Sequence, residues 1–177
     1  LAILIMTLSG WRIYNASPIW SFSIPAEWTM GGWLGGALQW HFAVMWVFVA
    51  NTAVYLIVNV VSGRLWSRFL PISPSEFLAN IKSVLTGHIE HPDLRRYNAV
   101  QRFAYLFVIA DLILIFLSGL VIWKSVQFPF LRDLMGGYEA ARVIHFGCMA
   151  GLVLFLLVHV MMALMVPKTI VAMVRGR

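Results

Sequence analysis

The sequence has few charged residues for its length. Of its 177 residues, 13 are Lys or Arg and 7 are Asp or Glu, so charged residues make up only 11%. Hydrophobic residues make up 61%, and the mean hydropathy is +0.84. This composition excludes an ordinary soluble domain and is typical of a membrane protein. The net charge of +6 therefore favours a role in membrane orientation over nucleic-acid binding.

Cysteine is also scarce, since Cys148 is the only one and lies inside an apolar run. A single thiol excludes an intramolecular disulfide. No basic segment precedes the first apolar run, so the pattern of a signal peptide is missing. The chain is already apolar at Leu1, and we expect its first helix to continue upstream of that residue.

The sequence contains four apolar segments, at about residues 1–15, 37–62, 101–123 and 142–166. The last three are long enough to cross a hydrocarbon core, which takes about 20 residues. None of the four alternates as a barrel strand would. We predict an all-α fold, a four-helix integral membrane bundle that forms a single domain over residues 1–177.

The cations are distributed unequally between the predicted loops. Residues 63–102 and the tail after Pro167 carry nine of the thirteen. The positive-inside rule then places this loop and both termini in the cytoplasm, with the protein multi-pass in the inner membrane if the host is a Gram-negative bacterium. The loops near residues 16–36 and 124–141 would face the periplasm.

Two short stretches of the sequence are repeated. The segment LSGWRIYN (8–15) resembles LSGLVIWK (117–124), and WHF (40–42) resembles IHF (144–146). The repeats predict two helical hairpins related by a pseudo-two-fold axis. Chance similarity among apolar residues is the alternative explanation.

Three histidines lie in the apolar segments, where ionisable side chains are costly and indicate function. His145 and His159 are fourteen residues apart, which puts them within about 40° on one helix face and about 21 Å apart along the axis. His41 and His145 lie at matching depths near the outer ends of their helices. A haem iron takes two such axial ligands, whereas zinc needs a larger donor set. Simple hydrogen bonding between helices is the alternative role.

The paired positions predict two b-type haems. His41 and His145 would bind the outer one, and His159 the inner one, nearer the cytoplasm. The partner of His159 should come from the inner end of the first helix, so we expect this fourth axial ligand upstream of Leu1.

These motifs resemble the bacterial cytochrome b561 and Ni-Fe-hydrogenase cytochrome b superfamily, the membrane dihaem subunits of respiratory oxidoreductases. The similarity extends over nearly the whole chain and rests on LSGWRIYNASPIW, WHF, YNAVQR, SGLVIWKSVQFP and IHFGCMAGLVLFLLVH. It implies the same assignment of His41, His145 and His159. It also implies an extracytoplasmic partner subunit, of the molybdopterin-dependent or hydrogenase-like kind.

Four further residues are candidates for contact with the cofactor. Gly10 and Gly119, in the repeated LSG, would let a backbone approach a flat ligand or another helix closely. Arg12 and Arg142 could pair with haem propionates or anchor lipid headgroups. Asp111, in mid-membrane, could relay protons or be neutral and hydrogen-bonded.

The loop before the third long segment offers candidates of another kind. Its end suits a quinone carbonyl or an inner-haem propionate, through Tyr97, Asn98, Gln101 and Arg102. His88 and His91 lie in a charged segment that is typical of a solvated loop.

The sequence thus predicts a transmembrane dihaem cytochrome b. It would carry electrons between a quinone pool, ubiquinone or menaquinone, and a redox subunit outside, with the lipid bilayer around it and no nucleic acid. Three alternatives stay open: a self-contained haem enzyme such as a superoxide oxidase, a haem-free anchor, and a small transporter. Whether the chain forms a homodimer is also open.

Overall fold

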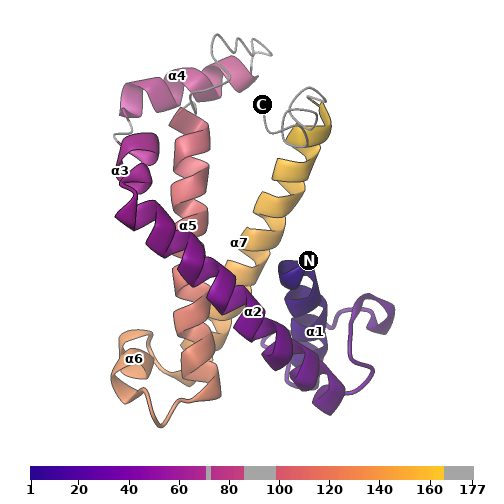
Figure 1. Cartoon of the computed structure of the whole chain (residues 1–177). Coiled ribbons are helices and arrows are strands. Elements are labelled where there is room, and N and C mark those ends of the chain that lie inside the picture. The colour runs from indigo at the N-terminus through magenta and orange to yellow at the C-terminus, as the bar shows by residue number, and fades with distance from the viewer. Residues whose placement is uncertain (71–72, 86–98, 166–177) are drawn as a thin grey trace. The chain divides into compact units, whose positions relative to one another are not determined.

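The computed structural model describes residues 1–70, 73–85 and 99–165, and all regular elements in this part are helices (Figure 1). The long helices are α1 (Ala2–Ala16), α2 (Leu34–Val61), α5 (Ala99–Trp123) and α7 (Tyr138–Met165). The short ones are the 3-10 helix η1 (Ala26–Trp28) and the α-helices α3 (Arg64–Phe69), α4 (Pro74–Leu85) and α6 (Pro129–Leu134). The prediction of an all-helical protein is confirmed.

Three of these helices are long and apolar enough to cross a membrane, at Leu34–Val61, Ala99–Trp123 and Tyr138–Met162. They correspond to the last three predicted segments, and almost none of their apolar surface is buried inside the protein. Such surface needs an apolar solvent, which a bilayer supplies. A fourth span, formed by α1, stays a prediction, because the described part of α1 has 15 residues.

The helix boundaries differ from the predicted ones mainly at the N-terminal ends of α2 and α7. α2 begins at Leu34 and α7 at Tyr138, three and four residues earlier than the apolar runs indicated. Polar residues extend α7, because Glu139 lies in its first turn, where a negative charge interacts favourably with the helix dipole. A purely apolar criterion cannot detect such a first turn.

The chain divides into two compact units, Leu1–Ile109 and Ala110–Arg177. In the first unit α1 packs against α2 (Figure 1). The loop between them is tied back to α1, since the Tyr14 hydroxyl donates to the carbonyl of Phe22 and the Asn15 side chain makes two hydrogen bonds with the backbone of Ile24. These bonds fix the polar end of the α1–α2 hairpin. A single domain over the whole chain stays a prediction.

The loop also depends on glycine where it meets the start of α2. Gly31 has a φ of +106°, and a Cβ there would lie 2.4 Å from the backbone nitrogen of Ala37. A Cβ on Gly36 would lie 2.2 Å from the carbonyl oxygen of Gly31. Neither backbone atom can move aside easily, so only glycine allows this close approach.

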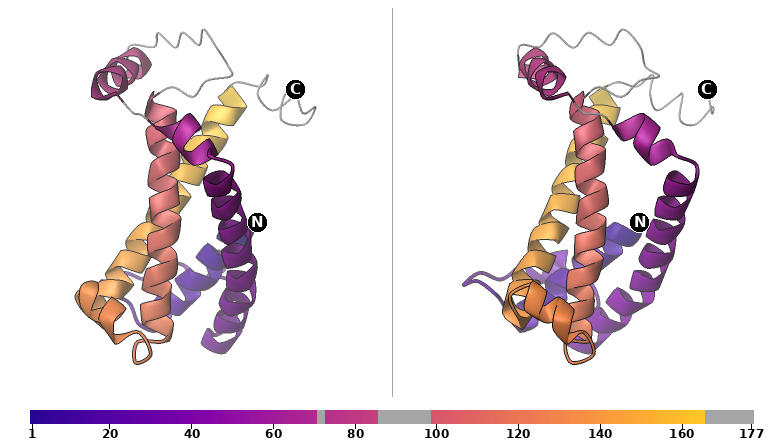
Figure 2. Two further views of the ribbon diagram at one scale, coloured as in Figure 1. Left: turned by 60° about the vertical axis from the view of Figure 1, so that its left-hand side comes forward. Right: turned by 90° about the vertical axis from the view of Figure 1, so that its left-hand side faces the viewer.

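The second unit is built on an α5–α7 hairpin, whose connection contains α6 (Figure 2). Two contacts show that the helices run antiparallel. Asp111 of α5 is hydrogen-bonded to Cys148 of α7, while Ser118, seven residues further along α5, meets His145, three residues earlier on α7. The buried residues Val121, Ala141 and Leu152 lie on the same two helices.

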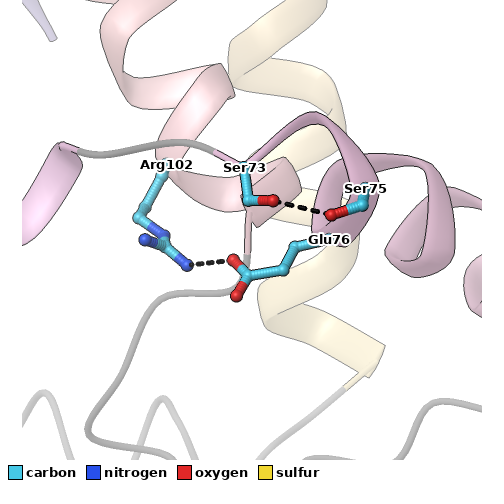
Figure 3. A network of polar contacts seen from close by, with 4 residues as sticks. All are labelled: Ser73, Ser75, Glu76 and Arg102. Atoms are coloured by element: carbon cyan, nitrogen blue, oxygen red, sulfur yellow. Dashed lines mark hydrogen bonds and ion pairs between the residues drawn. The ribbon is translucent and has the colours of Figure 1, made fainter.

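A polar contact joins α4 to the start of α5 within the first unit. Arg102 lies 3.3 Å from the Glu76 carboxylate, and the hydroxyls of Ser73 and Ser75 are 2.7 Å apart (Figure 3). The rings of Phe77 and Phe103 pack beside it, 5.2 Å between centroids. The exposed ion pair contributes about 0–1 kcal/mol, and together with the ring contact it connects α4 to the start of α5.

Candidate cofactor site

His41 lies on α2, and α1 holds its ring. The Nδ1 atom lies 3.1 Å from the hydroxyl oxygen of Ser9, and the ring also hydrogen-bonds to the backbone of Met6. Ser9 is fully buried, and its hydroxyl is 2.7 Å from the carbonyl of Ile5, four residues earlier. Because the Ser9 proton is directed to this carbonyl, its oxygen is free to accept from the histidine.

His145 on α7 has the same arrangement with α5. Its Nδ1 lies 3.1 Å from the hydroxyl oxygen of Ser118 and 3.0 Å from the carbonyl oxygen of Ile115. Ser118 is also fully buried, with its hydroxyl 2.8 Å from the carbonyl of Leu114. The contact set around His41 is thus repeated around His145, with the serine and histidine unchanged and two backbone partners changed in residue type: Ile5 and Met6 correspond to Leu114 and Ile115. The repeated LSG and HF motifs therefore carry a repeated structure.

These contacts decide which ring nitrogen can bind a metal. A carbonyl oxygen only accepts hydrogen bonds, so Nδ1 of His145 must carry the proton that it shares with Ile115. In a neutral imidazole the other nitrogen, Nε2, is then the unprotonated one, and an unprotonated ring nitrogen is the kind that binds a metal. A hydrogen bond of this kind on the far nitrogen is what orients a metal-binding histidine. The residues present therefore fit an axial ligand of haem.

The glycines of both LSG motifs face the histidine rings. A Cβ on Gly119 would lie 3.2 Å from Cε1 of His145, which is tighter than usual, and a Cβ on Gly10 would lie 3.5 Å from Cε1 of His41. Absence of a side chain thus gives each ring room beside its serine. Close packing against the histidine rings thus explains why glycine occupies these two positions. A close approach of Gly10 and Gly119 to a haem stays a prediction.

His159 lies near the other end of α7, which is helical without interruption from Tyr138 to Met165. The 21 Å spacing from His145 expected for a regular helix therefore applies. The His159 side chain is exposed, and its ring stacks on Phe155 at 5.7 Å between centroids. Its role as a ligand of an inner haem stays a prediction.

The two predicted arginines have partners in the structure. Arg12 donates to the backbone carbonyl of Gly32, and Arg142 lies 2.7 Å from the carboxylate of Glu139, one turn earlier. A guanidinium has five donors, so these contacts leave capacity for an anionic group. Pairing with propionates therefore stays a prediction for both.

Asp111 is buried, with 7% of its surface exposed, and it is hydrogen-bonded to Cys148. Its second oxygen, Oδ2, has no hydrogen-bond partner within the described residues. Of the two roles considered for Asp111, hydrogen bonding within the protein thus has a specific partner, Cys148, which the sequence did not indicate.

The remaining candidates are only partly described. Gln101 and Arg102 lie in the first turn of α5, where Arg102 is engaged by Glu76. Tyr97, Asn98, His88 and His91 lie outside the described residues. Within the described residues no three His, Cys, Asp or Glu side chains form a group that could hold a metal ion.

Long apolar helices with histidines that are hydrogen-bonded through Nδ1 are features that a membrane cytochrome would have. The sequence profile of the prokaryotic cytochrome b561 family matches residues 1–176, and the chain belongs to that family. It is a cytochrome b561-type electron-transfer protein of the bacterial membrane, and its family implies b-type haem.

Two relatives agree with this assignment. A protein of Azospira oryzae, named as the protein-methionine-sulfoxide reductase subunit YedZ1, is 58% identical over 175 residues, which are 99% of this chain and 88% of the relative. The cytochrome b556 subunit of formate dehydrogenase from Escherichia coli K12 is 31% identical over 97 residues, which are 55% of this chain and 44% of that subunit. No solved structure matches the chain significantly.

Proposed function

We propose that the protein is a transmembrane dihaem cytochrome b that passes electrons from a quinol to a redox subunit on the periplasmic face. The observation that carries this proposal is the repeated contact set that engages Nδ1 of both His41 and His145, because a proton held on Nδ1 leaves Nε2 as the unprotonated ring nitrogen. A histidine that served only to join helices would have no need of the same arrangement in both hairpins.

In this proposal His41 and His145 are the two axial ligands of the outer haem. His159 binds the inner haem, about 21 Å further along α7, and the second ligand of that haem stays a prediction. The haem supplies reversible one-electron chemistry at its iron. The chain supplies the axial nitrogens, an apolar surrounding and the cations Arg12 and Arg142 near the outer end, which are the features that tune a haem potential.

We further propose four spans, with α1 as the first, and a cytoplasmic location for both termini. The excess of cations in residues 63–102 and in the tail supports this orientation. A reporter inserted after Gly87 should therefore read cytoplasmic, and one after Gly137 periplasmic. Gly137 is a suitable site because a side chain there would meet open space. The opposite pair of readings would overturn the orientation and the outer position of the His41 haem.

The name of the Azospira relative supports a particular kind of partner, the catalytic subunit of a protein-methionine-sulfoxide reductase. Reduction of a sulfoxide to a thioether and water consumes two electrons and two protons, and a quinol releases two of each on oxidation to quinone. The formate dehydrogenase relative supports the reverse direction, because a dehydrogenase removes electrons from its substrate. We favour the first direction, since the identity is 58% against 31% and the match extends over nearly the whole chain.

The direct test uses the purified full chain with its haem in liposomes. Reduced ubiquinone and menaquinone analogues are added, and the haem absorbance is followed. A methionine-sulfoxide peptide and the Azospira reductase catalytic subunit are then supplied. We expect quinol to reduce the haem, and peptide turnover to reoxidise it only when the catalytic subunit is present.

Three results would contradict this function. A colourless purified protein would indicate an anchor or a transporter. Reduction of the haem by superoxide, without quinol or partner, would indicate a self-contained superoxide oxidase. Haem that quinol leaves oxidised but formate dehydrogenase reduces would indicate the opposite direction of electron flow.

A further inference from the structure

The two buried serines have a more specific role than helix packing. Each hydroxyl lies within hydrogen-bond distance of carbonyls three and four residues earlier on its own helix, at 3.2 and 2.7 Å for Ser9 and at 3.1 and 2.8 Å for Ser118. A serine in a membrane helix commonly makes such bonds and nothing else. Here each hydroxyl oxygen also meets the Nδ1 atom of a histidine from the next long helix.

The direction of these hydrogen bonds matters for the histidine. The serine donates its one proton to its own helix, so its oxygen can only accept from Nδ1–H. A hydroxyl that donates is also a better acceptor, because hydrogen bonds in a chain polarise one another. The histidine ring thereby becomes more electron-rich, which strengthens Nε2 as a ligand to iron.

We propose that Ser9 and Ser118 are positioning residues that fix the tautomer and ring orientation of His41 and His145 and so lower the reduction potential of the haem that these histidines hold. A more basic axial ligand stabilises ferric iron more than ferrous iron, which moves the potential downward. This inference rests on the proposed ligation and adds a determinant of potential that lies on α1 and α5.

The test compares S9A and S118A with the wild-type chain, purified with haem. We expect each variant to keep its haem and to have a higher midpoint potential, with an altered low-spin EPR signal. The double variant should show the larger shift. S9T and S118T keep the hydroxyl and should return toward the wild-type midpoint. The control is S62A. The Ser62 hydroxyl donates to the carbonyl of Val58, four residues earlier, as in the motif, and within the described residues Ser62 makes no contact with a histidine.

A second pair of variants keeps the test possible if an alanine variant fails to fold or to bind haem. S9C and S118C keep a similar shape but offer sulfur, a weak acceptor, so the midpoint should again rise. Alanine or cysteine variants that retain haem, midpoint and EPR spectrum unchanged would overturn the inference, as would alanine and threonine variants with equal shifts. Loss of haem in histidine variants together with silent serine variants would leave the proposed function standing and reject only this role.

Discussion

We expect replacement of His145 by alanine to abolish the outer haem. The hydrogen bonds of Nδ1 with Ile115 and Ser118 place the ring proton on Nδ1, so in the proposed ligation the unprotonated Nε2 binds the iron. Alanine removes that nitrogen, and a haem held by one remaining axial ligand binds weakly. The measured haem per chain should fall by about half, since the second haem does not use this residue. H41A should have the same effect through the other ligand.

Two controls make this prediction specific. Added imidazole should restore low-spin absorption in H145G, because the small molecule can occupy the space of the lost ring and again offer a nitrogen. H91A should keep the full haem content, since the sequence predicts that this histidine lies in a charged, solvated loop. If H41A and H145A both retain all of their haem, the pairing is wrong and another donor must be sought.

The second large effect is expected at His159. On the uninterrupted helix α7 this residue shares a face with His145, about 21 Å away. H159A should therefore lose the inner haem alone and keep the outer one. Electron transfer from quinol to an outer acceptor should stop, because a gap across most of the membrane replaces a relay of two haems.

The matched control for this variant is F155L. Phe155 stacks on the His159 ring and has no metal-binding atom, so its loss should change the haem environment without removing the haem. Absorption spectra with haem quantitation, and quinol-driven reduction in liposomes, measure both effects. An H159A protein with two low-spin haems would reject an inner haem on α7.

Much of the fold could be predicted because a bilayer demands long apolar helices. The spans at α2, α5 and α7 follow from runs with almost no charge, which few other structures tolerate. Helices such as α3 and α6 have six residues each, too few for a clear apolar periodicity. These helices begin at local backbone features, the left-handed Gly63 before α3 and Pro129 at the start of α6, which a hydropathy pattern does not contain.

The candidate site could be predicted only in part. His41 and His145 are conspicuous because histidine is rare in apolar segments. Ser9 and Ser118 were not identified as candidates, although they stand inside the repeated LSG motif. A serine in a membrane helix usually bonds its own backbone, so residue type alone does not indicate a contact with another helix. The signal that could have found them was the repeat itself, since each serine precedes a glycine that faces a histidine.

The duplication of this contact set has a consequence for biogenesis. Each histidine is oriented by a helix of its own hairpin, so the apoprotein completes two half-sites separately as it inserts. The entropy that each histidine side chain loses when its rotamer is fixed is then lost during hairpin folding and not during haem binding. If the haem is ligated as proposed, it binds last and connects the two hairpins, which have already folded. Haem-starved cells should therefore accumulate a membrane-inserted apoprotein with intact hairpins.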